Sequence, residues 1–145
     1  MMVTAGPGKQ LESRPMQIAK VEEDADLWFF TAANGRLVED IGADPSVLLV
    51  FQDELSAYLS LRCKARIVQD KARMMELWQE AYKVWFPGGL DDPDLALVGV
   101  RPVNAEYWDN RGMNKLEYMF EAAKAYVKGE QPDVEDIDKH AKVKM

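Results

Sequence analysis

The sequence predicts a mainly β protein, in which an antiparallel sheet forms a small closed or split barrel with helices at its periphery. Residues Ala57–Val68 alternate polar and apolar side chains with a period of two, as expected of a long strand with one buried face. Two shorter runs, Leu27–Phe30 and Val47–Phe51, are apolar and consist largely of aromatic or branched side chains, which favour strands. A barrel of about six strands is the economical arrangement, because closure removes exposed sheet edges.

The elements before the long strand follow from local signals. Met1–Ala5 and Leu11–Lys20 are extended runs on either side of Gly6–Lys9, whose glycines and proline predict the turn of a hairpin. Apolar residues spaced along Arg36–Ala43 predict a short helix, and a proline two residues further on ends it. The run Val47–Phe51 is continuously apolar, which is typical of a strand covered on both faces.

The elements after the long strand are predicted in the same way. Asp70 is the expected N-cap of a helix over Lys71–Phe86, which has a broad apolar face. Leu95–Trp108 reads as another long strand, and Arg101-Pro102 within it predicts an edge position or a bulge. Helical spacing returns over Lys115–Lys128, with a glycine suited to its C-cap.

Length and charge restrict the class of protein. With 145 residues the chain predicts one domain, residues 1–128, followed by a charged tail at 129–145 that either hangs free or docks on a partner. The formal net charge of −7 is unfavourable for binding nucleic acid or an anionic membrane surface. No apolar run approaches the roughly 20 residues that span a bilayer, and no signal peptide pattern is present. We therefore expect a soluble, cytoplasmic protein.

Several kinds of site are excluded or disfavoured. One cysteine, Cys63, and one histidine, His140, permit neither an intramolecular disulfide nor a Cys/His zinc cluster. Cys63 takes an inward position on the alternating strand, so we expect a buried and unreactive thiol. The carboxylates of Asp91–Asp94 lack the loop pattern of an EF-hand and are read as turn formers, and we expect no metal site. Phosphate-binding loop, hydrolase-elbow and zincin motifs do not occur.

Ordered motifs along the chain carry a family resemblance. Ser13–Gln17, Leu27–Thr31 and Val38–Pro45 resemble the FMN-binding split-barrel proteins related to pyridoxamine 5′-phosphate oxidase. Trp85–Asp94, and Val100–Pro102 followed by Ala105–Asp109, look like the general stress protein 26 group of that superfamily. The resemblance implies a six-stranded antiparallel split β-barrel that forms a homodimer and binds two flavin molecules, FMN or alternatively FAD, in the clefts between the subunits.

The resemblance also implies which residues contact the cofactor. A flavin has a dianionic phosphate, which needs cationic and hydroxyl donors, and a flat ring, which needs aromatic surface and extended backbone. The segment that begins at Arg14 lines the ring and the phosphate. An aromatic-threonine pair and the start of the short helix approach the phosphate. A tyrosine and a tryptophan also contact the flavin, and the tryptophan comes from the second subunit. These candidates are Arg14, Pro15, Met16, Gln17, Ile18, Phe30, Thr31, Gly35, Arg36, Leu37, Tyr58 and Trp108.

The chain departs from the family pattern at identifiable positions. Gly35 and Leu37 stand where the family commonly offers a serine and a lysine to the phosphate, which predicts weaker FMN binding. Gly35 retains a backbone amide at a helix start, a favourable place for an anion. Asp109–Met113 replaces the substrate-handling stretch of the oxidases, so oxidation of pyridoxamine phosphate is not expected. The chain also begins directly in the hairpin, where relatives usually have a preceding helix.

Three functions are compatible with this pattern. The first is an FMN-dependent oxidoreductase acting on an unidentified substrate, in which the cofactor carries the electrons and the protein positions it. The second is a non-catalytic protein that stores or senses flavin. The third is a dimeric interaction module that has lost flavin, which Gly35 and Leu37 favour. Without the resemblance, Arg14 and Arg36 would be read as solvated surface charges, and Trp28, Trp78 and Trp85 as core or interface aromatics.

Overall fold

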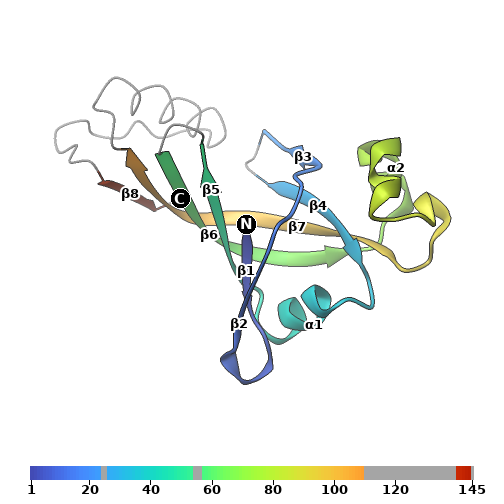
Figure 1. Cartoon of the computed structure of the whole chain (residues 1–145), viewed down its shortest axis with the longest axis horizontal. Coiled ribbons are helices and arrows are strands. Elements are labelled where there is room, and N and C mark those ends of the chain that lie inside the picture. The colour runs from blue at the N-terminus through green and yellow to red at the C-terminus, as the bar shows by residue number, and fades with distance from the viewer. Residues whose placement is uncertain (24–25, 54–56, 110–139, 145) are drawn as a thin grey trace.

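An open, strongly curved antiparallel sheet forms the body of the protein (Figure 1), as seen in a computed structural model that describes residues 1–23, 26–53, 57–109 and 140–144. The sheet has eight strands in the order β2-β1-β5-β6-β7-β4-β3, and β8 pairs with β7 off this path. The strands are β1 Met2–Ala5, β2 Leu11–Arg14, β3 Lys20–Val21, β4 Leu27–Ala32, β5 Ser46–Gln52, β6 Ala57–Val68, β7 Leu95–Asp109 and β8 His140–Lys144. The helices are α1 Arg36–Ala43 and α2 Lys71–Leu77, with 3₁₀ turns η1 Pro7–Lys9, η2 Glu80–Val84 and η3 Gly89–Asp91.

The mainly β, antiparallel class is confirmed, but the described sheet has eight strands where six were predicted, and of the two predicted forms, a closed or a split barrel, the closed one is not present in the described residues. The path of described strands ends at β2 on one side and β3 on the other, and these two do not pair. The predicted strand Leu11–Lys20 ends at Arg14, because Pro15 has no N–H for the ladder, and the chain pairs again only at β3. The hairpin itself is confirmed, with β1 and β2 in antiparallel register across η1.

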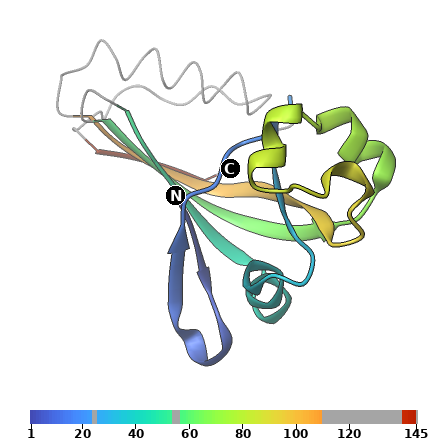
Figure 2. The same cartoon turned by 45° about the vertical axis from the view of Figure 1, so that its right-hand side comes forward.

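The two longest strands, β6 and β7, form the spine of the sheet (Figures 1 and 2). The predicted bounds of β6 are confirmed, and β7 runs one residue further than predicted. Cys63 pairs with Pro102 while Arg62 pairs with Asn104, so the register shifts and Val103 is the extra residue of a bulge. The irregularity expected at Arg101-Pro102 is therefore present, and it bends the long strands.

Two hydrophobic clusters lie on the two faces of β4. One face, with Leu27 and Phe29, packs into the cluster enclosed by the curved sheet and α1, while the other, with Trp28 and Phe30, is covered by α2 and the 3₁₀ turns. A strand covered on both faces is thus present, but at β4. For β5 the prediction of two covered faces is wrong, because its inward residues are buried and its outward residues remain partly exposed or exposed.

The helix predicted over Lys71–Phe86 is wrong in its extent, although its start is confirmed. The Asp70 carboxylate accepts a hydrogen bond of 3.2 Å from the Arg73 amide, as an N-cap does. The helix ends at Leu77 because Trp78 is extended, which allows its ring to reach Phe30 at 5.4 Å between centroids. The following turn, η2, brings Tyr82 to 5.3 Å from the same ring. The helix α1 is confirmed with the predicted bounds.

The C-terminal part is described only at its end. The predicted helix Lys115–Lys128, its C-cap at Gly129 and the tail through residue 139 lie outside the described residues. Residues 140–144 form β8 against β7, so the end of the tail is part of the sheet. Among the described helices, none has the length and apolar character needed to cross a membrane.

Candidate functional site

Ten of the twelve predicted cofactor residues fall into three places in the structure. Pro15, Met16, Gln17 and Phe30 meet in a hollow beside η2. A second group lies around α1, and a third, a cross-strand pair, lies on the outer face of β6 and β7. The second group comprises Arg14, Gly35, Arg36 and Leu37, and the third comprises Tyr58 and Trp108.

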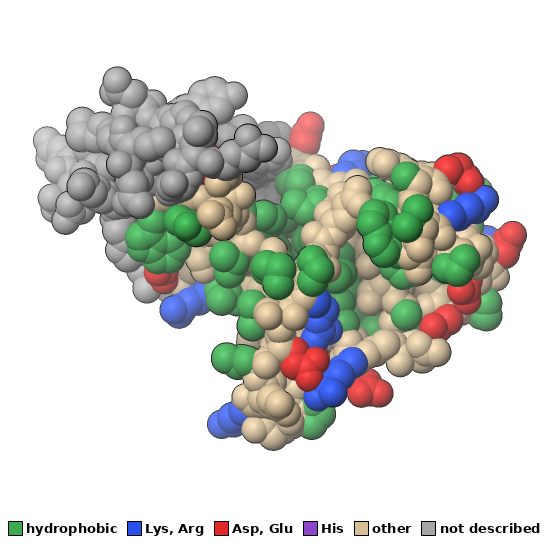
Figure 3. Space-filling view, viewed as in Figure 1, with side chains coloured by type: hydrophobic (Ala, Val, Ile, Leu, Met, Phe, Trp, Pro, Cys, Tyr) green, Lys and Arg blue, Asp and Glu red, His purple; other side chains and the backbone are tan. Residues whose placement is uncertain are grey.

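The hollow has a volume of about 520 Å³ and walls that are predominantly apolar. Its lining residues are Pro15, Met16, Gln17, Phe30, Tyr82, Trp85 and Phe86. This volume lies within the range of about 300–1,000 Å³ that is usual for small-molecule sites. In the space-filling view, hydrophobic side chains lie among charged ones around α2 and the adjoining turns, and charged side chains also lie beside the β1–β2 hairpin (Figure 3).

The first wall of the hollow is a segment that has left the sheet. After Pro15 ends β2, residues 15–19 run outside the strands, until the Ala19 amide donates to the Trp28 carbonyl at 2.7 Å. The backbone of this segment is therefore not used by a strand ladder. Phe30 on β4 forms the base of the hollow, and its ring centroid lies 6.3 Å from that of Phe86. A bound ring would meet backbone outside the strands and aromatic surface there.

Arg14, expected at the flavin phosphate, is engaged inside the protein. Its guanidinium donates to Oδ2 of Asp40 at 2.9 Å, and to Thr4 and Glu12 at 3.2 Å each. Asp40 is fully buried on α1. Burial raises the pKa of this carboxyl, but hydrogen bonds from Thr4 and Arg14 more than offset that effect, so the pKa lies below its ordinary value. Arg14 thus holds the hairpin to α1.

The start of α1 offers one exposed cation. Arg36 is exposed and pairs with Oε1 of Glu12 at 2.5 Å. Gly35 is the N-cap with extended backbone, and the first amides of a helix are left without partners inside it. Leu37 is only 4% exposed and packs in the core, so its position cannot present a side chain to an anion. Gly35 is also tightly placed, since a Cβ there would lie 3.0 Å from the Ala32 carbonyl oxygen.

Tyr58 and Trp108 are direct partners across the β6–β7 ladder. Both belong to the face of the sheet opposite the core residues Leu61 and Ala105. Tyr58 is exposed, and its hydroxyl accepts a hydrogen bond of 3.2 Å from the Gln52 amide nitrogen. The pair does not line the hollow of its own chain. Its position is compatible with the prediction that it serves a site on a second copy.

Thr31 and Ile18, the remaining candidates, are directed elsewhere. Thr31 is buried on β4, paired in register with Ala96, while Ile18 packs partly buried against the main hydrophobic cluster. Successive strand residues point to opposite faces, so Thr31 cannot share the face that Phe30 gives to the hollow. The structure therefore brings together only part of the predicted set.

The second wall of the hollow was missed as a site. Tyr82, Trp85 and Phe86 were assigned to the apolar face of a long helix or left as core aromatics, whereas here they line the hollow. The available signal was the density of aromatic residues directly before Pro87-Gly88-Gly89, where a helix cannot continue. This signal was overlooked because the spacing of the aromatic residues also fits one face of a helix.

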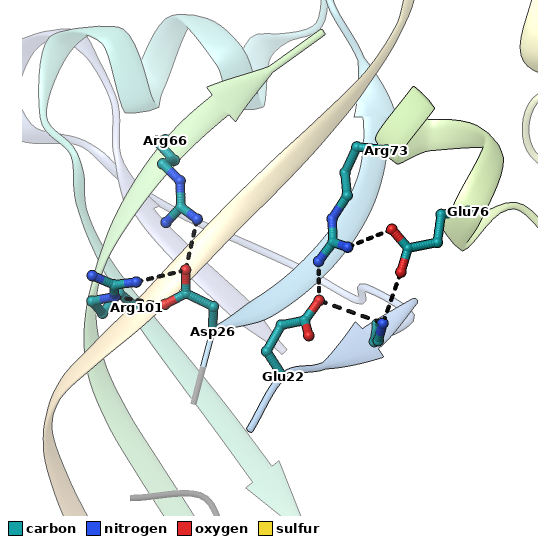
Figure 4. Close-up of polar contacts among 7 residues, drawn as sticks. Glu22, Asp26, Arg66, Arg73, Glu76 and Arg101 are labelled. Atoms are coloured by element: carbon teal, nitrogen blue, oxygen red, sulfur yellow. Dashed lines mark hydrogen bonds and ion pairs between the residues drawn. The ribbon is translucent and has the colours of Figure 1, made fainter. Parts of the chain in front are cut away.

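A charged cluster outside the hollow was also not predicted (Figure 4). Asp26, nearly buried, accepts hydrogen bonds from Arg66 at 2.6 Å and from Arg101 at 2.6 and 3.1 Å. Burial raises the pKa of Asp26, but the two arginines more than offset this and hold it below its ordinary value. The Arg66 guanidinium also lies 4.9 Å from the centroid of the Trp28 ring. Both side chains pack against Gly99, where an added Cβ would lie 3.0 Å from each of them. This cluster fixes the β3–β4 corner to β6 and β7.

These features define a class: a small, open antiparallel sheet with a ring-sized aromatic hollow at one edge. A family model described as pyridoxamine 5′-phosphate oxidase like matches residues 1–133. The chain therefore belongs to the pyridoxamine 5′-phosphate oxidase-like family. The resemblance identified from the motifs is confirmed.

Several solved structures are similar to the chain. A Clostridium acetobutylicum protein related to general stress protein 26 is 25% identical, with a TM-score of 0.69 over 77% of this chain and 80% of that one. The general stress FMN/FAD binding protein of Xanthomonas citri is 26% identical, with a TM-score of 0.62 over 77% and 81%. General stress protein 26 of Bacillus anthracis, at 21% identity and TM-score 0.63 over 73% and 81%, shares the fold. A comparison with curated protein sequences gave no match.

Proposed function

We propose that this chain is a flavin-binding protein of the general stress protein 26 type, which binds FMN and uses it in oxidation or reduction of a substrate. The observation that carries the proposal is the hollow in which Pro15, Met16, Gln17 and Phe30 meet. The first three belong to the segment that the family resemblance implies for the flavin ring and phosphate, and Phe30 belongs to the aromatic-threonine pair that it implies for cofactor contact. The similarity to a Xanthomonas citri protein described as FMN/FAD binding supports the same cofactor class.

The ring of a flavin suits this part of the molecule. The hollow of about 520 Å³ is large enough for a planar ring system and is lined largely by apolar and aromatic groups. Backbone outside the strands, at residues 16–18, supplies amides and carbonyls for the polar edge of the ring. A bound flavin supplies the electron-transfer chemistry, and the protein contributes binding and orientation.

The phosphate has weaker support. Arg14 is held by Asp40, and Leu37 is buried in the core. Among the candidate residues that the structure describes, Arg36 and the amides at the start of α1 are the groups suited to an anion, and Arg36 already has Glu12 as a partner. We therefore propose that most of the affinity comes from the ring and that the phosphate adds little.

A homodimer completes the proposal. Tyr58 and Trp108 lie on the outer face of the sheet, away from the hollow of their own chain. In the family such a tryptophan approaches the flavin bound to the other subunit. We propose that the outer faces of two copies meet, so that each copy contributes this pair to the site of its partner.

The absorption spectrum of the purified protein tests flavin binding. A yellow protein, or quenching of flavin fluorescence when FMN is added, is the expected result; a colourless protein that ignores FMN contradicts the proposal. The phosphate assignment is tested by titrating riboflavin beside FMN. Arg36→Ala should weaken FMN binding by about 3–10-fold and leave riboflavin unchanged, whereas Lys71→Ala, an exposed cation on α2, should change neither.

Oxidoreductase activity requires a separate test. The flavin-loaded protein is mixed with NADH or NADPH, and loss of the yellow absorbance, followed by its return with oxygen or a quinone, is the expected result. A flavin that binds but is never reduced would favour storage of flavin over catalysis.

One observation favours a second candidate, a dimeric interaction module without flavin. Two cations are missing at the phosphate, because Arg14 is engaged by Asp40 and because the buried Leu37 stands where the family commonly has a lysine. The same titration decides between the two, because the interaction module forms a dimer but quenches neither FMN nor riboflavin.

A further inference from the structure

The wall formed by Tyr82, Trp85 and Phe86 is not explained by the cofactor segment. These residues come from η2 and the two positions after it, and they belong to the same hydrophobic cluster as Phe30. Trp85 is 60% exposed although it lines the hollow, whereas Tyr82 is buried at 4%. A large aromatic side chain that is half in water gains by covering a ligand, since exposed aromatic surface is then removed from solvent.

The charge of the hollow defines what it can hold. Of the described residues around it, none of those that line it carries a carboxylate, an ammonium or a guanidinium group. The charged residues of η2 neutralise each other, because Lys83 and Glu80 pair at 2.6 Å. Glu80 also accepts a hydrogen bond of 3.1 Å from the Trp78 indole. A charged ligand would lose its hydration without gaining a counter-charge, which is costly.

The shape of the wall favours a flat ligand. The rings of Tyr82 and Phe86 are inclined to that of Phe30 by 50° and 54°, so faces and edges are both presented. Aromatic pairs gain about 0.5–1.5 kcal/mol beyond area burial in such arrangements. The polar groups among the lining side chains are the Gln17 amide, the Tyr82 hydroxyl and the Trp85 indole N–H, enough to orient a neutral ring compound through hydrogen bonds.

We propose that this wall binds the substrate, and that the substrate is a flat, uncharged ring compound contacted by Trp85. The inference rests on the proposed function in one respect, that a flavin ring occupies the Pro15–Gln17 wall of the same hollow. It excludes phosphorylated substrates, for which the lining offers no cation. It also assigns a binding role to the segment between α2 and η3.

A pair of fluorescent probes with the same rings tests the charge. N-phenyl-1-naphthylamine is neutral, and 1-anilinonaphthalene-8-sulfonate is its sulfonated counterpart. We expect the neutral probe to bind with increased fluorescence, and the sulfonated probe to bind about tenfold or more weakly, because its charge is unpaired in the hollow. Equal or tighter binding of the sulfonated probe would overturn the proposal.

Variants locate the binding. Trp85→Ala should weaken binding of the neutral probe by about 3–10-fold, whereas Val84→Ala, at the neighbouring position and 80% exposed but not lining the hollow, should leave it unchanged. Both positions are exposed, so both variants should fold, and thermal unfolding checks this. An unchanged titration in Trp85→Ala, or equal losses in both variants, would contradict a contact at Trp85.

Repeating the titration with saturating FMN separates this inference from the proposed function. Retention of the neutral probe beside FMN supports a substrate wall distinct from the cofactor wall, and displacement of the probe by FMN overturns it. If FMN does not bind at all, the cofactor proposal fails while the two probes still decide the ligand class. If sedimentation shows that the probe is expelled as a dimer forms, the hollow is covered by a second copy and the inference is overturned.

Discussion

Buried carboxylates at two positions explain how this small sheet is held to its surroundings. Asp40 on α1 meets Arg14 and Thr4, and Asp26 at the start of β4 meets Arg66 and Arg101. A buried charge is tolerated only when paired and hydrogen-bonded. The arginines are thereby committed to the fold, which is why Arg14 cannot be counted as a free cation for a phosphate.

The ion pairs of Asp26 predict a pH dependence of stability. Its pKa is lowered in the folded state, so its contribution is present above the unfolded pKa of about 4 and is lost as the pH falls through the folded value. Asp26→Asn should lower the free energy of unfolding at pH 7 by about 1–3 kcal/mol and flatten its fall in acid. Urea unfolding at a series of pH values measures both effects.

The matched control is Asp91→Asn, because Asp91 is 94% exposed and pairs only with Lys71 among its recorded ion pairs. Surface pairs contribute little, so the control should stay near the parent protein. Similar curves for the two variants would show that the Asp26 cluster does not carry the expected stabilisation.

Cys63 gives a prediction at alkaline pH. Burial raises the pKa of this thiol to about 12, despite a hydrogen bond to backbone that lowers it. The folded protein should therefore react slowly with a disulfide reagent such as dithionitrobenzoate, and quickly once unfolded in guanidinium. Because the unfolded thiol ionises first, stability should fall as the pH rises above about 9. Rapid reaction of the folded protein at neutral pH would show that Cys63 is accessible.

At the scale of elements, local sequence patterns predict the bounds of a helix or strand correctly where tertiary contacts do not override them. The bounds of α1 and β6 follow from side-chain periodicity and from a helix-ending proline, and the structure has the same bounds. Tertiary contacts decided the rest. Trp78 and Tyr82 lie outside α2 and contact the Phe30 ring. Because α2 covers the second face of β4, that strand is buried on both faces. Neither contact can be read from a run of residues.

The N-cap of α2 is the element-scale feature with a direct test. Asp70 accepts from the Arg73 amide and is exposed, so its replacement removes a cap without opening a cavity. Asp70→Ala should lower the free energy of unfolding by about 1 kcal/mol. Asp70→Asn, which also caps helices well, should restore most of it. Equal losses in the two variants would place the effect on charge rather than on capping.

In the candidate site, too, some residues could be predicted from the sequence and others could not. Pro15, Met16, Gln17 and Phe30 were reached through the family resemblance, because motif order reports on the fold as a whole. The engagement of Arg14 with Asp40 was not, since 26 residues separate them and hydrophobic periodicity says nothing of ion pairs. The aromatic wall was hidden for a different reason. Its spacing also fits an amphipathic helix, and that reading is ambiguous in short apolar segments.

At the scale of the whole molecule, the outer face of the sheet is the surface that we propose meets a second copy. Leu48 and Val50 on β5 point away from the core and pair in register with Arg62 and Ser60 on β6. Tyr58 and Trp108 continue the same face. The net charge of −7 is unfavourable both for an anionic cofactor and for self-association. Apolar contact across this face is the interaction able to offset it.

This surface predicts that assembly and flavin binding are lost together. Leu48→Glu places a carboxylate in the centre of the outer face, and burying it unpaired in an interface is costly. We expect the variant to sediment as a 16.5 kDa monomer, where the parent sediments at twice that mass, and to quench flavin fluorescence about tenfold less well. Met75→Glu, on the exposed side of α2, is the matched control and should change neither property. A monomeric Leu48→Glu protein with full flavin affinity would show that one chain holds the complete site. A variant that stays dimeric would exclude this face as the interface. Parallel loss of both properties, in contrast, supports a site that the partner completes, because the substitution lies outside the hollow of its own chain.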